Sequence, residues 1–91
     1  MITGLNTAID YQGECYHVQT EDGGEEHPVI TTLLFKGGGI LLSRKTAYGE
    51  TAKTVTGYDP EVVKNMMKEQ HKNMLKDLVA GRIPLTAQPT A

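Results

Sequence analysis

"VITTLLFKGGGILLSRKT", residues 29–46, is the stretch that decides the fold of this 91-residue chain. Its first seven residues are rich in β-branched and other apolar side chains, which favour a β-strand. The glycines at 37–39 permit the positive φ angles of a tight turn, because glycine has no Cβ atom. A second apolar run follows at 40–46. The stretch therefore predicts an antiparallel hairpin with strands at 29–35 and 40–46.

A second hairpin is predicted upstream of the first. "NTAIDY" at 6–11 and "ECYHVQT" at 14–20 read as strands on either side of the turn signal "QG". The segment "EDGGEEHP", residues 21–28, combines glycines, acids and a proline, and so predicts a loop. The simplest connection of the four strands is an antiparallel meander.

A long helix is predicted after an irregular crossover at residues 47–58. Asp59 is a good N-cap, Pro60 suits the first helical turn, and Gly81 suits the residue that follows a helix. Apolar side chains recur at spacings of three and four between these signals: Val63, Met66, Met67, Met74, Leu75 and Leu78. This stripe is expected to cover the sheet, and a seam between two helices of a dimer is the alternative.

These elements together predict one small α+β domain at residues 1–83, an antiparallel sheet of about four strands packed against one long C-terminal helix. The tail at 84–91 has no apolar period and is expected to be disordered. The N-terminus lacks the features of a secretion signal, and no apolar run is long enough to span a membrane. The single Cys15 fits a reducing compartment. We therefore expect a cytoplasmic protein without membrane contact.

Charge is distributed unevenly along the chain. The formal net charge is −2, yet residues 1–35 carry −6 and residues 36–91 carry +4. A nucleic-acid binder would need a larger basic excess, so no nucleic-acid partner is expected. The helix carries lysines at a spacing of four residues: Lys64, Lys68, Lys72 and Lys76. Like charges at this spacing mildly oppose a helix, so the lysines form either a basic ridge for an acidic partner or a solvated face.

Both sides of the predicted sheet are apolar at its centre. Alternate residues of the third strand form two sets, Val29, Thr31, Leu33 and Phe35 on one side and Ile30, Thr32 and Leu34 on the other. On the fourth strand, Ile40 and Leu42 point away from Leu41. One helix can cover only one side, so the other side is expected to curl strongly or to pair with another protein. We assign Ile30, Leu34 and Leu41 to this contact surface.

The stretch "ECYHVQTEDGG", residues 14–24, contains an unbroken row of hydrogen-bonding residues. Alternation places Tyr16, Val18 and Thr20 toward the core. A polar row is expected on the opposite side: His17, Gln19, Glu21 and Asp22, with Arg44 and Thr46 added by a nearby strand. This row fits partner recognition, in which hydrogen bonds set the register, or a structural role that fixes the acidic loop against the sheet.

Patterns for catalysis and metal binding are weak. Cys15 and His17 lack the second ligand pair of a zinc site, and residues two apart on a strand are about 7 Å apart, too far for direct proton transfer. The acids at 21–26 do not follow calcium-loop spacing, and the glycines at 37–39 lead into a strand rather than into the helix of a phosphate loop. We therefore assign no catalytic residue, no metal ligand and no cofactor.

Three motifs resemble a small domain family of deltaproteobacteria and their relatives: "NTAIDYQGECYHVQTEDGG", "HPVITTLLFKGGGILLSRKTAY" and "VVKNMMKEQHKNMLKDL". The family signature is "YHVQTED" followed by a "PVI-T-LF-GG-I--S-KT-Y" pattern, and the resemblance covers residues 6–79. The chain is also similar to polarity proteins of the RomX type, which work with a response-regulator-like partner to promote nucleotide exchange on a Ras-like motility GTPase. The resemblance implies a non-enzymatic adaptor and supplies no site residue.

The expected function is a non-enzymatic protein–protein interaction adaptor or regulatory module, homodimeric or bound to a protein partner. The resemblance connects it to a bacterial polarity and motility GTPase pathway. The alternative is a small-ligand or metal-binding domain that uses His17, Gln19, Glu21 and Asp22. Convergence of His17 and His27 on a cleft would favour the alternative, whereas a flat apolar face in an interface would favour the adaptor.

Overall fold

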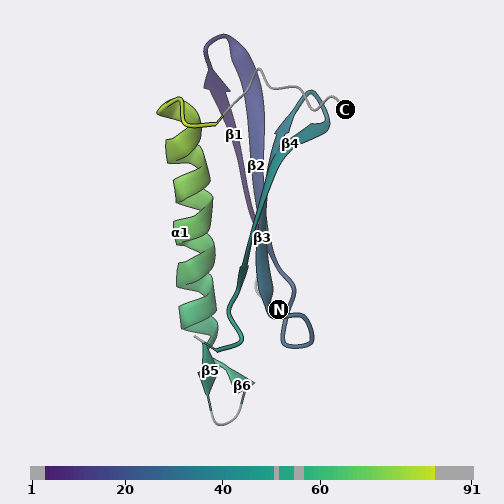
Figure 1. Ribbon diagram of the computed structural model, residues 1–91, viewed down its shortest axis with the longest axis vertical. Coiled ribbons are helices and arrows are strands. Elements are labelled where there is room, and N and C mark those ends of the chain that lie inside the picture. Colours follow the sequence, from purple (N-terminus) through teal and green to yellow (C-terminus); the bar gives the residue numbers. More distant parts are fainter. Residues whose placement is uncertain (1–3, 51, 55–56, 84–91) are drawn as a thin grey trace.

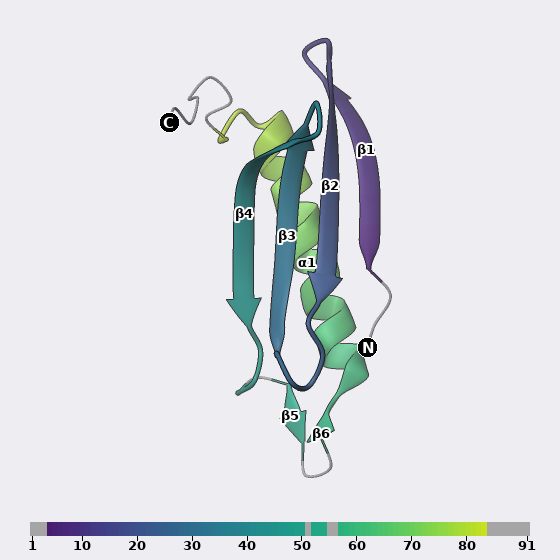
Figure 2. The same ribbon diagram turned by 90° about the vertical axis from the view of Figure 1, so that its right-hand side faces the viewer.

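The computed structural model describes residues 4–50, 52–54 and 57–83. Antiparallel strands form a four-stranded sheet in the order β1-β2-β3-β4: Leu5–Tyr11, Glu14–Asp22, Val29–Lys36 and Gly39–Ala47. The helix α1, Pro60–Val79, runs along one side of this sheet (Figure 1, Figure 2). The predicted α+β meander with one long C-terminal helix is confirmed. The predicted tail at 84–91 lies outside the described residues.

Both hairpins of the sheet turn through two residues with positive φ. Gln12 and Gly13 have φ angles of 52° and 79°, and Gly37 and Gly38 have φ angles of 59° and 85°. Two successive positive φ angles are the geometry of primed turns, whose twist matches that of paired strands. The local chemistry of these turns therefore sets where each hairpin closes.

The hairpin of β3 and β4 contains a β-bulge. Leu34 pairs with Leu42 and Phe35 pairs with Ile40, which leaves Leu41 as an extra residue in β4. Paired residues share a side of the sheet, so Leu42 lies on the side of Leu34 while Ile40 lies on the side of Phe35. The prediction that Ile40 and Leu42 point the same way is wrong, because strict alternation is broken at the bulge.

The crossover between β4 and α1 contains a short antiparallel ribbon, β5 (Lys53–Thr54) and β6 (Gly57–Tyr58), at the end of the sheet where α1 begins (Figure 1). Tyr48 is buried at the start of this crossover. Its hydroxyl donates a hydrogen bond to Asp22 Oδ1, and its ring meets the ring of Tyr58 edge to face at 5.4 Å. These contacts attach the crossover to the last residue of β2.

α1 begins and ends at the predicted signals. Asp59 Oδ1 accepts a hydrogen bond from the N–H of Glu61 at 2.9 Å, and Gly81 follows the helix with a φ of 74°. The residues that α1 buries are Val63, Met67, His71, Met74 and Leu78. The apolar stripe thus covers the sheet, with Met66 and Leu75 half-buried at its margins. Within the described residues, no helix is both long and apolar enough to cross a membrane.

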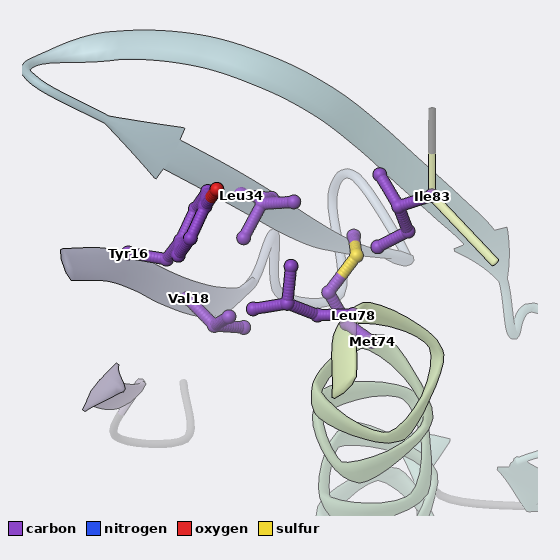
Figure 3. Packing of buried hydrophobic residues seen from close by; sticks show 6 residues of the cluster. All are labelled: Tyr16, Val18, Leu34, Met74, Leu78 and Ile83. Atoms are coloured by element: carbon purple, nitrogen blue, oxygen red, sulfur yellow. The ribbon is translucent and has the colours of Figure 1, made fainter. Parts of the chain in front are cut away.

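The core beneath α1 consists of two apolar clusters. One contains side chains from β2, β3, the C-terminal part of α1 and the segment after it (Figure 3): Tyr16, Val18, Leu34, Met74, Leu78 and Ile83. The other lies toward the start of α1: Ile30, Tyr48, Ala52, Val63 and Met67. Hydrogen-bonded side chains from the strands and the helix also lie beneath α1: Thr7, Thr20, Thr32, Gln70 and His71. The centre of one side of the sheet is therefore packed beneath α1.

Candidate interaction surface

The two sides of the sheet differ in what lies over them. Among the described residues, α1 packs on one side, which we call the covered face, and no helix or strand packs on the other, which we call the open face (Figure 1, Figure 2). The register of the strands assigns each side chain to a face. The side chains of the open face are Asn6, Ala8, Asp10, Cys15, His17, Gln19, Glu21, Val29, Thr31, Leu33, Phe35, Ile40, Ser43, Lys45 and Ala47.

An apolar stripe runs along β3 on the open face, and we define it as Val29, Leu33, Phe35 and Ile40. The first three side chains are half-buried by their neighbours within the sheet. Ile40 is 56% exposed and lies beside Phe35, because the bulge at Leu41 turns it to this face. The bulge therefore extends the apolar stripe from β3 onto β4.

A polar row on β2 lies next to the apolar stripe. His17, Gln19 and Glu21 point to the open face as predicted, since Tyr16, Val18 and Thr20 of the same strand are buried beneath α1. The Nε2 atom of His17 lies 3.2 Å from Asn6 Oδ1, and its ring meets the ring of Phe35 edge to face at 6.3 Å. The row thus forms the polar border of the stripe.

Asp22 does not belong to this row, which corrects the sequence-based assignment. Its side chain is on the covered face and is buried, and its Oδ1 atom accepts hydrogen bonds from the Tyr48 hydroxyl and from the N–H of Gly24. Burial and the hydrogen bond to Asp22 raise the pKa of Tyr48. Asp22 is therefore a structural residue that closes the loop after β2.

The assignment of Ile30, Leu34 and Leu41 to the contact surface is also wrong. Ile30 and Leu34 are fully buried beneath α1, and Leu41 is half-buried against the cluster that contains Leu34. The reason is the register, because Leu34 pairs with the buried Val18 and must point to the same face. The apolar residues available to a partner are the alternate set of β3.

Arg44 and Thr46 lie on the covered face, where they connect the edge of the sheet to α1 rather than extending the row of His17. Arg44 Nη2 is 2.8 Å from Asp77 Oδ2, and the Thr46 hydroxyl donates a hydrogen bond to Gln70 Oε1. Hydrogen bonds from Arg44 and Arg82 lower the pKa of Asp77. Arg44 and Thr46 both line a shallow groove of about 530 Å³ between β4 and α1.

The lysines of α1 form a surface separate from the open face. Lys64, Lys68 and Lys72 are exposed on the helix, whereas the open face is on the far side of the sheet. Lys64 and Lys68 border a hollow of about 400 Å³, which Leu5 and Met67 also line. The basic ridge therefore remains a prediction independent of the open face.

A chain of hydrogen bonds crosses the covered face beneath α1. His71 Nε2 lies 2.8 Å from Thr7 Oγ1, and His71 Nδ1 lies 2.8 Å from Thr20 Oγ1. Thr20 Oγ1 is 2.7 Å from Thr32 Oγ1, which accepts from Gln70 Nε2 at 3.0 Å. Burial, with a smaller contribution from His17, lowers the pKa of His71. The chain fixes the position of α1 on the sheet.

The proposed ligand row does not form one site. His17, Gln19 and Glu21 lie on the open face, Asp22 lies on the covered face, and His27 lies in the loop beyond β2. Across residues 4–50, 52–54 and 57–83, no three His, Cys, Asp or Glu side chains gather as metal ligands. The open face is therefore the strongest candidate for a functional surface.

Comparisons of this chain with protein-family models, with curated proteins and with solved structures found no match.

Proposed function

We propose that this chain is a non-enzymatic protein–protein interaction module, an adaptor or regulator that binds its partner through the open face of the sheet. One observation carries the proposal. An antiparallel sheet with one face packed usually presents polar residues on the other face. Here the centre of the second face presents Leu33 and Phe35, with Ile40 beside them, and an apolar patch of this kind is typical of an interaction site.

The composition of the open face supports the proposal. Stable interfaces combine an apolar centre with a polar border. The apolar stripe has His17 and Gln19 on one flank and Ser43 and Lys45 on the other. Strand spacing and rise give the face a flat footprint of roughly 450 Å², more than half of the ~800 Å² that each partner buries in a standard interface.

The pathway follows from the resemblance alone. If the chain acts like the polarity proteins that it resembles, its partner is the response-regulator-like protein or the Ras-like motility GTPase. This part of the proposal has a direct test, which is nucleotide exchange on the purified GTPase with and without the chain. Stimulated exchange that Leu33→Asp removes would support both the pathway and the surface, and unchanged exchange would remove the pathway.

The contact surface is tested by covalent capture from the native host followed by reconstitution with the purified partner. We expect the wild-type chain to retain a partner and Leu33→Asp to lose it, because a carboxylate would be desolvated at the centre of the interface. Val79→Asp is the matched control, since Val79 is an exposed apolar residue on α1 that is 50% exposed. Binding that survives Leu33→Asp but not the loss of Lys64 and Lys68 would move the site to the basic ridge.

A further inference from the structure

The register arranges the side chains of the open face in rows across the strands. One row contains Asn6, Gln19, Leu33 and Ser43. This row lies halfway along the face, because two further rows lie on each side of it. The outermost row contains Asp10 and Cys15 at one end of the face, and Val29 and Ala47 at the other. A symmetry axis through the row of Leu33 therefore gives the greatest overlap of two such faces.

We infer that the occupant of the open face is a second copy of this chain, stacked face to face about a two-fold axis that crosses the strands at Leu33. This inference rests on the proposed function, because it names the partner of the same surface. A two-fold contact is closed, so it produces a dimer and no longer assembly. Stacked sheets lie about 10 Å apart with their strands within roughly 30° of each other, the angle that the twist of two such sheets produces.

Chemical matching across the axis supports this arrangement. Each strand stacks on the same strand of the second copy and runs in the opposite direction, so Leu33 meets Leu33 of the second copy. On β2, His17 and Glu21 are equally far from Gln19 in opposite directions, so the imidazole of each copy faces the carboxylate of the other. On β3, Phe35 and Thr31 are related in the same way to Leu33, and a large side chain faces a smaller one.

Charge does not oppose the same arrangement. Glu21 and Lys45 lie one row away from the axis. Along the strands, each is therefore about 13 Å from the same residue of the second copy. The stem of Lys45 faces Ile40 of the second copy, and a lysine stem can cover apolar surface while its ammonium group stays in water. No carboxylate faces another carboxylate, and no ammonium group faces another.

The other two-fold arrangement, with the axis parallel to the strands and between β2 and β3, fits less well. It would stack β2 on β3 of the second copy, so Gln19 would face Leu33 and Glu21 would face Thr31. The amide of Gln19 would then lose water without an evident hydrogen-bond partner, which is costly. The polar row and the apolar stripe are matched only when each strand meets itself.

The first test is the mass in solution, measured by light scattering and by sedimentation over a range of concentrations. We expect a dimer for the wild-type chain, a monomer with an unchanged circular dichroism spectrum for Leu33→Asp, and a dimer for Val79→Asp. Glu21→Gln is a milder second variant that keeps the apolar stripe, and it should raise the dissociation constant. A wild-type chain that stays monomeric at its highest soluble concentration overturns the inference.

The second test measures the direction of the axis through thiol cross-linking with a short bismaleimide. The two copies of Cys15 would lie about 27 Å apart, because Cys15 is four residues from the axis on β2. Gln19→Cys in a Cys15→Ser background would place two thiols beside the axis. We expect rapid cross-linking of this variant and none of the wild-type chain. Cross-linking of the wild-type chain as well would overturn the axis across the strands and favour the axis parallel to them, which would bring both the two copies of Cys15 and the two thiols at position 19 close together. No cross-linking of the Gln19→Cys variant would exclude both axes.

Failure of this inference is distinguishable from failure of the proposed function. If the wild-type chain is a monomer and Leu33→Asp loses a captured partner, the open face binds a different protein and only the dimer is excluded. If Leu33→Asp changes neither the mass nor the capture of any partner, both the dimer and the proposed contact surface are excluded.

Discussion

The covered face and the open face of the sheet are built from alternate residues of the same strands, yet they have different roles. On β3, Ile30 and Leu34 are fully buried beneath α1, whereas Leu33 and Phe35 keep part of their surface exposed. The apolar character of the two sets is similar. The comparison shows that what lies over a face, and not its hydrophobicity, decides whether its residues stabilise the fold or remain available to a partner.

Polar groups explain why α1 covers the face that it does. The buried stripe of the helix is interrupted at its centre by Gln70 and His71, whose side chains need hydrogen-bond partners. The covered face presents Thr20 and Thr32 at the matching position, whereas the open face presents Leu33 there. A buried polar group without a partner costs about 1–3 kcal/mol, so these hydrogen bonds add to the apolar preference of β2, which places Tyr16 and Val18 on the covered face.

The largest expected effect separates the two faces directly. Leu34→Asp places a carboxylate in the apolar core and should destabilise the fold by more than about 4 kcal/mol, enough to unfold a small domain. Leu33→Asp lies one residue away on the open face and should cost less than about 1 kcal/mol. Urea unfolding followed by circular dichroism measures both. A folded Leu34→Asp beside an unfolded Leu33→Asp would reverse the assignment of the faces.

The hydroxyl groups of β3 give the next largest effect. Thr32→Val removes the oxygen that accepts from Gln70 and bonds Thr20, and we expect a loss of about 1–3 kcal/mol. Thr31→Val on the open face is the matched control, and it should change the free energy of unfolding by less than about 0.5 kcal/mol. Equal losses for the two variants would show that the hydrogen-bond chain does not select the covered face.

Acid should weaken the covered face through His71. Its pKa is lowered in the folded protein, mainly by burial, so the unfolded chain takes up a proton first as the pH falls. The free energy of unfolding should therefore decrease as the pH falls below about 6.5, the ordinary value for histidine. Urea unfolding at several pH values measures this slope. His71→Gln should flatten it between about pH 6.5 and 5, and a slope unchanged by this substitution would contradict the prediction.

The smallest expected effect on stability concerns the bulge. Ile40→Ser removes an exposed apolar side chain and should change the free energy of unfolding by no more than about 0.5 kcal/mol. The same substitution should weaken self-association, because Ile40 extends the apolar stripe. Sedimentation compares the dissociation constants of the two proteins. An unchanged dissociation constant would restrict the contact surface to β2 and β3.

The predictions from sequence succeeded where the signal is local. The turn at Gln12 and Gly13 and the N-cap at Asp59 are recognisable from a few neighbouring residues, and the alternation of β2 placed His17 and Gln19 away from the core. Asp22 was misplaced because residues 21–28 were predicted as a loop, whereas β2 continues to Asp22 and its alternation puts this side chain on the face of Thr20. The bulge at Leu41 was not predicted, because an extra residue in one strand has no sequence signal of its own.

The sequence by itself determined the four strands of the sheet, the turns of its hairpins, the helix and their order, because each of these depends on propensities and caps within a few residues. The ribbon of β5 and β6, within the crossover predicted as irregular, was not among them. Only the tertiary structure decided which face of β3 lies beneath α1, because the two alternate sets of residues on that strand are similarly apolar. That choice depends on hydrogen bonds between side chains distant in sequence, such as Thr20 and His71. The tertiary structure also decided that Leu33, and not Leu34, is available to a partner.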